Sequence, residues 1–166
     1  MIVPESFHAG SDDLPWADEW AGDPQIKLKL LMADIEGARF AVRMLFEPGV
    51  LVFPHKHTGE VHAFTFAGAW AYIDYPNSPS NRAGSYLFEP PGSTHTLKVA
   101  DDVDGQTDVL FIIYGAMLHY DLAGQLVGVT DAESVLREYP ERLRQQGKPV
   151  PEVLPIGGSM AYRPCP

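Results

Sequence analysis

The chain has 166 residues, of which 45% are hydrophobic, and a formal net charge of -10 at pH 7. This length supports one hydrophobic core and is too short for two ordinary domains joined by a linker. The longest apolar runs, Val50 to Phe53 and Val109 to Tyr114, are far shorter than the roughly 18 residues of a membrane span. Because nucleic-acid affinity comes largely from lysine and arginine, the acidic charge disfavours nucleic acid and anionic membranes as partners.

Two further features bear on the cellular location. The sequence starts Met1-Ile2-Val3-Pro4-Glu5 and lacks the basic start and apolar stretch of a secretory signal. Its one cysteine, Cys165, excludes an intrachain disulfide. We therefore expect a cytoplasmic protein.

We expect a single domain over residues 1–166, which begins with an irregular N-terminal arm (1–25) and continues as a barrel (26–129). In the arm, Trp16 and Trp20 are expected to pack against the same barrel or a partner subunit. The barrel region consists of short β-branched, aromatic and aliphatic runs bounded by turn formers. The predicted strands are Ile26 to Met32, Phe40 to Phe46, Val50 to Phe53, Val61 to Phe66, Trp70 to Tyr75, Ser85 to Phe88, His95 to Val99, Val109 to Tyr114, Met117 to Tyr120 and Gln125 to Val129. Many short strands without intervening helices indicate an all-β barrel or sandwich.

A helical segment is expected over residues 130–148. Thr130 or Asp131 is a suitable N-cap, Gly147 is a suitable C-terminal stop, and Pro140 is expected to kink or split the helix. The remaining residues, 149–166, hold five prolines and are expected to form an extended arm or a frayed tail.

Three histidines carry the strongest functional signal. His55 and His57 are two residues apart, so on a strand they share one face, with α-carbons about 7 Å apart. His95 follows the tight turn of Pro90 to Gly92 and is expected on a neighbouring strand. Neutral imidazoles bind transition metals at about 2.0 to 2.2 Å, so the three predict one metal site that loses its ion as pH drops through roughly 6 to 6.5.

These residues resemble the two motifs of the cupin superfamily. The matching positions are Gly49, His55, His57 and Gly68 in the first motif and Gly84, Pro90, Gly92 and His95 in the second. The glutamate of the first motif is missing, because its position is Val61, or His62 with the longer spacing. The final asparagine of the second motif is Val99. The resemblance implies an all-β double-stranded β-helix, a jelly-roll barrel of two antiparallel sheets with the metal between them, followed here by the helical segment.

Within the superfamily, the chain resembles the 2,4'-dihydroxyacetophenone dioxygenase family over about residues 12–145. The resemblance rests on Asp13 to Trp16, His55 to Phe64 (HKHTGEVHAF), Phe88 to Gly92 (FEPPG), His95 to Leu97, and a hairpin near Asp121 to Gly128. It implies a non-haem Fe(II) enzyme that binds the ketone and hydroxyl oxygens of a small, aromatic α-hydroxyketone and uses O2 to break the bond between the two oxygenated carbons. The products of the family's named substrate are 4-hydroxybenzoate and formate.

The missing glutamate has a chemical consequence. Three neutral histidines would leave the +2 charge of the metal uncompensated and three coordination positions open on one face. Such a site is expected to attract an anionic bidentate ligand, for example an enolised hydroxyketone. The cofactor is expected to be Fe(II), with Zn, Mn or Ni as alternatives, because geometry and availability set the metal more than the ligand type does.

Other candidate residues leave alternatives open. His62 is a fourth ligand, an orienting donor or a packed strand residue, while Glu60 and Glu89 are candidates to orient a ligand imidazole. His8 and His119 lie outside both motifs and are expected to be structural or exposed. Aromatic surface for an apolar pocket is available, although core packing explains most of it and no substrate contact is assigned; the residues are Phe46, Phe53, Phe64, Phe66, Trp70, Tyr86 and Tyr114.

Two other functions remain open: a metal-binding sensor module, similar to the zinc cupin domain of some anti-sigma factors, and a non-oxidative metallocupin such as an isomerase or lyase. The sensor reading is weakened because that zinc site uses a glutamate where Val61 stands. The expected partners are a small-molecule substrate and O2, and a homodimer or higher homo-oligomer is expected, with the tryptophan-bearing arm as a candidate contact.

Overall fold

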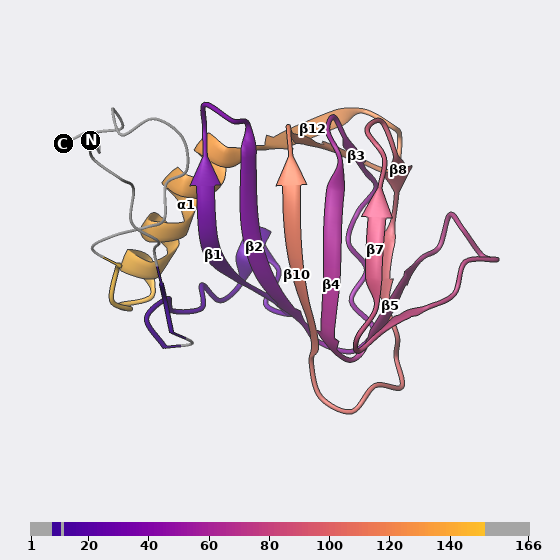
Figure 1. Cartoon of the computed structure of the whole chain (residues 1–166), viewed down its shortest axis with the longest axis horizontal. Helices are drawn as coiled ribbons and strands as arrows, with labels where there is room; N and C mark the ends of the chain where they lie inside the picture. The colour runs from indigo at the N-terminus through magenta and orange to yellow at the C-terminus, as the bar shows by residue number, and fades with distance from the viewer. Residues whose placement is uncertain (1–7, 11, 152–166) are drawn as a thin grey trace, which may run out of the picture.

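The computed structural model describes residues 8–10 and 12–151, which form short strands, one 3-10 turn and one α-helix (Figure 1). In chain order the elements are η1 (Trp20–Gly22), β1 (Ile26–Asp34), β2 (Arg39–Phe46), β3 (His55–His57), β4 (Val61–Ala67), β5 (Ala69–Tyr72), β6 (Asn81–Arg82), β7 (Tyr86–Glu89), β8 (Thr94–His95), β9 (Leu97–Val99), β10 (Thr107–Tyr114), β11 (Met117–Tyr120), β12 (Leu126–Thr130) and α1 (Ala132–Gln145). The predicted all-β fold with a C-terminal helix is confirmed.

All the strand pairs are antiparallel, and the described strands make three hydrogen-bonded sheets. The five-stranded sheet has the order β1-β2-β10-β4-β7, the four-stranded sheet β12-β11-β3-β8, and the three-stranded sheet β6-β5-β9. A single residue, Thr96, separates β8 from β9 and so links the two smaller sheets. The predicted antiparallel sheets are present, with the two smaller ones divided at Thr96.

Side-chain alternation along the long strands separates a barrel interior from an outer surface. On β4, Val61, Ala63 and Thr65 are buried, whereas Phe64 and Phe66 are exposed. The buried residues of β1, β2, β4 and β10 form one core together with residues of the arm and of α1. Burying this apolar surface is the main force that holds the two sides of the barrel together.

The N-terminal arm packs against the barrel of its own chain. Ala17 forms an isolated antiparallel bridge with Leu28, with N to O distances of 2.8 and 2.9 Å. Trp20 is 9% exposed and belongs to the core, while Trp16 lies under the Lys29 ammonium, 4.7 Å from ring centroid to nitrogen. Of the two contacts expected for the tryptophans, the structure shows the one with their own barrel.

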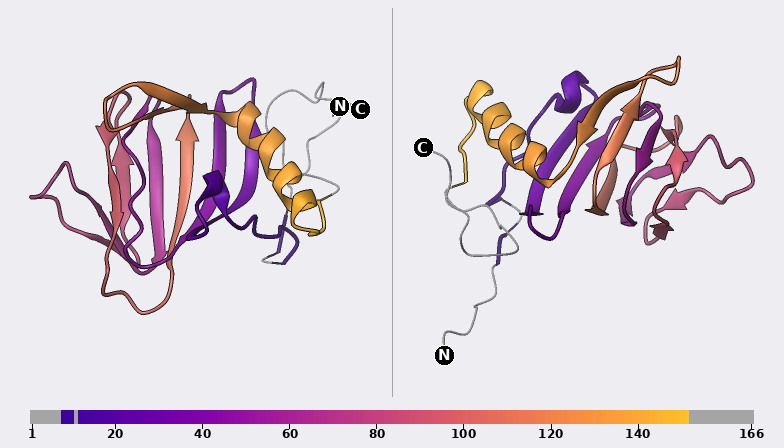
Figure 2. Two further views of the ribbon diagram at one scale, coloured as in Figure 1. Left: turned by 180° about the vertical axis from the view of Figure 1, so that it is seen from behind. Right: turned by 90° about the horizontal axis from the view of Figure 1, so that it is seen from above.

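Helix α1 begins with a capping box and packs against β1 (Figure 2). The Asp131 carboxylate accepts a bond from the Ser134 amide at 2.9 Å, and the Ser134 hydroxyl accepts one from the Asp131 amide at 2.8 Å. Asp131 is therefore the N-cap. Pro140 lies inside one continuous helix, so the predicted split does not occur. The buried Tyr139 and Leu143 on either side hold the helix against the core.

Three predicted strands differ from the observed ones. Val50 to Phe53 contains only a single bridge, Leu51 to Lys98, with hydrogen bonds from the Val52 amide to the Leu97 carbonyl and from the Val99 amide to the Val50 carbonyl. The predicted strand Trp70 to Tyr75 ends at Tyr72. The predicted strand His95 to Val99 is broken at Thr96, whose amide donates to Asp74 Oδ2 at 2.5 Å, outside either ladder.

No helix among residues 8–10 and 12–151 has the length and apolar character needed to cross a bilayer. The expected Pro-rich tail of residues 149–166 lies mostly outside the described residues, since positions 152–166 are not among them.

Candidate metal centre

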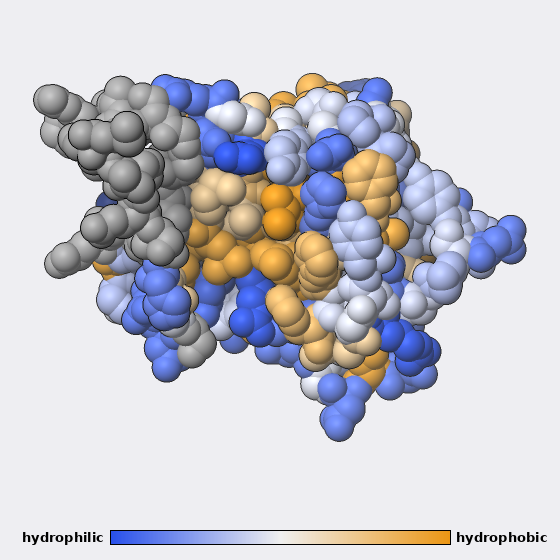
Figure 3. Space-filling model, in the orientation of Figure 1, coloured by the Kyte–Doolittle hydropathy of each residue, from blue (hydrophilic) through white to orange (hydrophobic). Residues whose placement is uncertain are grey.

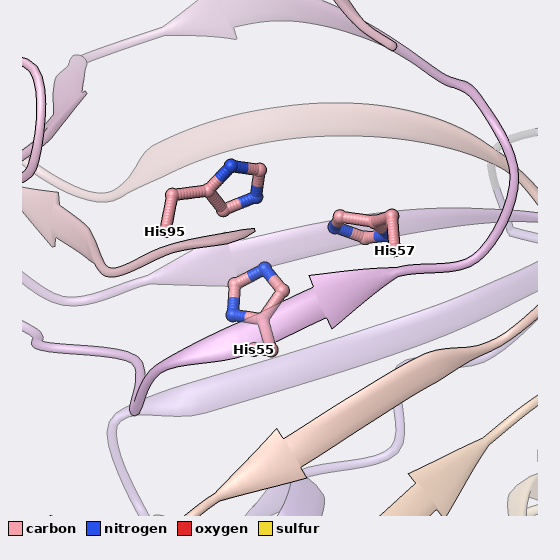
Figure 4. A group of neighbouring side chains, drawn as sticks. All are labelled: His55, His57 and His95. Carbon is pink, nitrogen blue, oxygen red and sulfur yellow. The ribbon is translucent and has the colours of Figure 1, made fainter. Parts of the chain in front are cut away.

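The three histidines singled out by sequence meet on the inner side of two paired strands (Figure 4). His55 and His95 are direct cross-strand partners in the β3–β8 pair, and His57 follows on the same face of β3. Their ring centroids are 4.8 to 5.2 Å apart, and one ligand nitrogen from each lies within 4.8 Å of the others. All three are 4% exposed or less. This is the convergence that the spacing predicted.

A tight turn sets the position of His95. The Ser93 amide donates to the Pro90 carbonyl at 3.2 Å, and Gly92 has a φ of 87°. Pro at the second position and a positive φ at the third are the features of a type II β-turn, which favours glycine. The Gly92 amide also donates to the His57 carbonyl at 2.8 Å. The Pro-Pro-Gly sequence therefore fixes His95 against the strand that carries His57.

Burial keeps His55 and His57 neutral over most of the pH range. Desolvation is the main cause that lowers the pKa of His55 to about 3 and the pKa of His57 to about 4. His55 Nδ1 lies 3.0 Å from the Phe53 carbonyl oxygen, which accepts its hydrogen. This bond leaves Nε2 of His55 with a free lone pair, the form of imidazole that binds a metal.

A carboxylate, Glu89, stands beside the histidines. It is 3% exposed, and its Oε2 lies 3.2 Å from Nε2 of both His57 and His95. Burial alone raises the pKa of Glu89, but hydrogen bonding to His95 and the Tyr72 hydroxyl and the electrostatic interaction with the neighbouring histidine rings outweigh it, so the pKa is lowered. The Tyr72 hydroxyl donates to Glu89 Oε1, and the Tyr72 ring stacks on His95 at 3.7 Å. Glu89 is thus an ionised group within the cluster.

Glu89 bears on the expectation of an uncompensated metal charge, because it places a carboxylate oxygen 3.2 Å from two of the three histidines. Glu89 on β7 is the direct cross-strand partner of Val61 on β4, the position where the cupin glutamate was expected. The chain therefore places a carboxylate one strand away from the expected one. Counting residues along the first motif could not identify this carboxylate, because Glu89 belongs to the second motif.

Several buried polar atoms in the cluster have no hydrogen-bond partner within the described part of the chain. They are His57 Nδ1, His95 Nδ1, His95 Nε2, Glu89 Oε2 and Ser93 Oγ. Buried polar groups are normally paired, and leaving one unpaired costs about 1–3 kcal/mol. Imidazole nitrogens and a carboxylate oxygen without partners are suitable donors for a divalent transition metal. The residues present therefore fit a metal ion.

His62 and Glu60 do not join the cluster. His62 is on β4, where its neighbours Val61 and Ala63 face the core, so its side chain is on the outer surface. Its Nδ1 lies 2.8 Å from the Tyr86 hydroxyl and its Nε2 3.4 Å from Glu60 Oε1. Of the alternatives for His62, the structure supports a packed strand residue. His8 is exposed.

A cavity of about 350 Å³ runs from the histidines across the barrel interior. It is bounded at one end by His55, His57, Tyr72 and Glu89. Elsewhere its wall is mainly apolar and comes from η1, β1, β2, β10, β12 and α1; it includes Trp20, Leu28, Phe40, Val42, Phe46, Phe111, Val129, Val135 and Glu138. Among residues 8–10 and 12–151, no lysine or arginine lines it.

Two pocket residues were not identified from sequence. His119 is the cross-strand partner of His55, its ring centroid is 6.3 Å from that of His55, and its Nε2 lies 2.8 Å from Thr130 Oγ1. Burial lowers the pKa of His119. Tyr72 has no motif that marks it. Only the order of strand pairing, which sequence alone does not give, brings both to the site.

The aromatic residues proposed for a pocket mostly lie elsewhere. Of the seven, only Phe46 lines the cavity with the histidines, and Phe53 lines a separate surface groove beside His119. Phe64, Phe66 and Tyr86 are exposed on the outer side of the sheet. Alternation predicts which residues share a face, but it does not say which face is inside.

Comparison with known proteins gives a family and a set of structural neighbours. A family model described as the ChrR cupin-like domain matches residues 5–118. A search of curated proteins finds no significant match. Among solved structures, a protein of unknown function with a cupin-like fold from Ralstonia eutropha JMP134 is 27% identical, with a TM-score of 0.86; the alignment covers 98% of this chain and 99% of that one.

Two further neighbours share the fold at lower identity. An RmlC-like cupin protein from Ralstonia eutropha JMP134 is 20% identical, with a TM-score of 0.82 over 91% of this chain and 94% of that one. An acetylacetone dioxygenase from Acinetobacter johnsonii is 17% identical, with a TM-score of 0.72 over 84% of this chain and 93% of that one.

Proposed function

The chain belongs to the family of ChrR cupin-like domains. We propose that it is a non-haem Fe(II) dioxygenase. It would use O2 to cleave the carbon-carbon bond beside the carbonyl of a small, aromatic α-hydroxyketone-like substrate. The observation that carries the proposal is the cluster of three histidines, two of which, His55 and His57, line a mainly apolar cavity.

In this proposal His55, His57 and His95 hold the metal, and Glu89 balances part of its charge. A bound Fe(II) would supply the one-electron chemistry that lets O2 react with an organic substrate. The Tyr72 hydroxyl keeps Glu89 in place through its bond to Oε1, and the Phe53 carbonyl fixes the His55 tautomer. With one carboxylate beside a +2 ion, one positive charge is left, which an enolised hydroxyketone would neutralise.

The cavity supports an uncharged substrate of moderate size. Its wall is mainly apolar, and its charged side chains, Glu89 and Glu138, are acidic. Away from the metal, a carboxylate or phosphate on the substrate would therefore lack a cationic partner. A volume of about 350 Å³ is at the lower end of the range for small-molecule sites and leaves room for an aromatic ring beside the metal.

The proposed reaction balances without another co-reactant. A hydroxymethyl ketone and one O2 give a carboxylic acid and formic acid: the bond between the two oxygenated carbons breaks, and each of these carbons gains one oxygen atom. The substrate is oxidised by four electrons and O2 is reduced by four. The fold shared with an acetylacetone dioxygenase supports the choice of a ketone as substrate.

The test is to purify the protein without oxygen, measure bound metal, load Fe(II), and follow oxygen uptake with 2,4'-dihydroxyacetophenone, other α-hydroxyketones and acetylacetone. We expect stoichiometric uptake and release of one acid pair for at least one hydroxyketone. No uptake across this panel with iron-loaded protein would overturn the dioxygenase proposal.

Metal binding is tested separately from activity. The double variant His55→Ala, His57→Ala is expected to lose the metal, whereas His62→Ala, the matched change on the outer face, is expected to keep it. Stoichiometric metal in the double variant would overturn the site itself.

A second candidate is a non-oxidative metallocupin or a metal-binding module. The donor set of three histidines with a nearby carboxylate favours it as well, since such a set also binds Zn, Mn or Ni. Tight binding of Zn with no oxygen uptake in the iron-loaded protein would select this candidate.

A further inference from the structure

A fourth histidine, His119, lies at the cavity beside the three candidate metal ligands. It is on β11 directly opposite His55, and direct cross-strand partners point to the same face of a sheet, so its side chain is on the inner side. Its ring centroid is 6.3 Å from that of His55, compared with 4.8 to 5.2 Å among the three candidate ligands. His119 therefore adjoins the metal site without being one of the clustered ligands.

One ring nitrogen of His119 is paired, whereas the other is available. Nε2 lies 2.8 Å from the Thr130 hydroxyl, and within residues 8–10 and 12–151 no hydrogen-bond partner faces Nδ1. Thr130 is the last residue of β12 and directly precedes Asp131, the N-cap of α1, so its hydroxyl has a fixed position. His119 and Thr130 both line the cavity. The pair thus offers a ligand one ring nitrogen that the protein itself leaves unused.

The neighbouring strand leaves space at the His119 ring. The cross-strand partner of His119 on β12 is Gly128, which also lines the cavity. A Cβ at Gly128 would lie 3.8 Å from Cδ2 of His119, so a side chain at this position would contact the ring. Glycine weakens a strand and often marks a place where a ligand comes close to the backbone. The missing side chain therefore leaves room for a ligand beside His119.

The rest of the cavity offers few other polar contacts. Apart from the groups around the metal site and the indole of Trp20, its polar side chains are His119, Thr130 and Glu138. Glu138 is on α1 and its side chain is 58% exposed. A neutral imidazole carries one N–H and one lone pair, and a hydroxyl can donate or accept. If Nε2 donates to Thr130, Nδ1 of His119 can accept a hydrogen from a ligand hydroxyl.

We propose that His119, held in place by Thr130, accepts a hydrogen bond from the hydroxyl group of the substrate and so selects α-hydroxyketones over simple ketones. A ketone oxygen has no hydrogen to donate, and a site built to pair with a hydroxyl rejects the analogue that lacks it, because its own polar group is then left unpaired. The inference rests on the proposed function for the class of substrate, but it concerns binding and does not require turnover.

The test is calorimetric titration of the zinc-loaded protein with 2-hydroxyacetophenone and with acetophenone, which differs only in lacking the hydroxyl. Zinc has no redox chemistry, so binding is measured without turnover. His119→Phe should weaken hydroxyketone binding by about 3- to 10-fold, the value of one hydrogen bond, and change acetophenone binding by less than about twofold. His119→Gln, which keeps a donor and an acceptor, should recover part of the loss. Thr130→Val should cause a smaller loss of the same kind.

The matched control is His62→Phe on the outer side of the five-stranded sheet, where the His62 side chain is 29% exposed. Figure 3 shows this side of the sheet, on which hydrophobic and hydrophilic side chains are mixed, so we expect it to tolerate a phenyl ring. This variant should leave both affinities unchanged. Thermal unfolding and the metal bound per chain check the fold of each variant.

The decisive quantity is the ratio of the two affinities, because a merely structural role would lower both alike. Equal losses for the two ketones, or no loss for either, in folded and metal-loaded His119→Phe would overturn the proposal. Absence of binding of both ketones to the unchanged chain would overturn it as well. The dioxygenase proposal is decided by oxygen uptake, so a ratio that falls as expected without any uptake would reject the reaction and leave this binding role standing.

Discussion

The chain contains two groups of histidine, glutamate and tyrosine on opposite sides of the barrel wall. The inner group is His95, Glu89 and Tyr72, and the outer group is His62, Glu60 and Tyr86. In the outer group both ring nitrogens of the histidine have a polar neighbour, Tyr86 on one side and Glu60 on the other. In the inner group both nitrogens of His95 lack a hydrogen-bond partner within the described residues.

The difference shows what separates a candidate site from an ordinary surface cluster. The outer histidine and glutamate side chains are 29 and 41% exposed, so water can satisfy them. The inner pair is 1 and 3% exposed and depends on its immediate neighbours. Residue types are alike in the two groups, whereas burial without a partner occurs only in the inner one. Paired changes in the two groups therefore test the comparison.

The largest difference is expected for the two histidines. Loss of a group that only orients a metal ligand lowers metal affinity by about 10- to 100-fold. His95 is a candidate ligand itself, so His95→Ala should lower the affinity by more than about 100-fold. His62→Ala should leave the affinity unchanged. Metal titration of the metal-free protein measures both, and equal losses in the two variants would contradict the distinction.

The next effect concerns pH. Below pH of about 6.5 the unfolded chain takes up protons on His55 and His57. The folded chain takes up a proton on His57 only near pH 4 and on His55 only near pH 3, because burial lowers both pKa values. The unfolded state then binds more protons. The free energy of unfolding of the metal-free protein should therefore fall by about 1.4 kcal/mol per pH unit for each histidine as pH drops from 6.5 to 4.

Denaturant unfolding at a series of pH values measures this slope, and His57→Gln should reduce it by about half. A free energy of unfolding that does not change between pH 6.5 and 4 would contradict the neutral state of these two buried rings.

The two glutamates should differ by a smaller factor. Glu89→Gln keeps the shape but removes the charge beside His57 and His95, so metal affinity should fall about 10- to 100-fold. Glu60→Gln acts on an exposed pair, whose energy is about 0–1 kcal/mol, and should change metal affinity by less than about twofold. Calorimetric metal titration of both variants would show whether the carboxylate charge matters only inside.

The smallest difference is expected for the tyrosines. Tyr72→Phe leaves the buried Glu89 Oε1 without its donor, which should cost about 1–3 kcal/mol of stability. Tyr86→Phe removes a half-exposed hydroxyl and should stay within about 0.5 kcal/mol. Urea unfolding of the metal-free variants gives both values. A loss for Tyr86→Phe as large as that for Tyr72→Phe would show that burial is not the deciding factor.

Much of the fold follows from local patterns. Alternation from Phe40 to Phe46 predicted β2, and the Asp131 to Ser134 sequence predicted the start of α1. The errors occur where tertiary contacts decide. Pro140 remains within one helix because Tyr139 and Leu143 are buried against the core, and the break at Thr96 depends on Asp74, 22 residues earlier.

The candidate site divides in the same way. His55, His57 and His95 were identified because their spacing and the Pro-Pro-Gly turn are local features. Tyr72 and His119 were not, because only pairing between distant strands brings them to the cavity. Glu89 was a candidate from sequence, but its position opposite Val61 required the register of β4 and β7.

The far end of the cavity is built from different parts of the chain than the histidine end. Trp20 and Ala21 come from η1 and Val135 and Glu138 from α1, while the histidines come from β3 and β8. Substitutions in the arm and in α1 can therefore reshape the space for the substrate without moving a candidate ligand. For the proposed function, random libraries aimed at altered substrate range should therefore concentrate on these two peripheral segments.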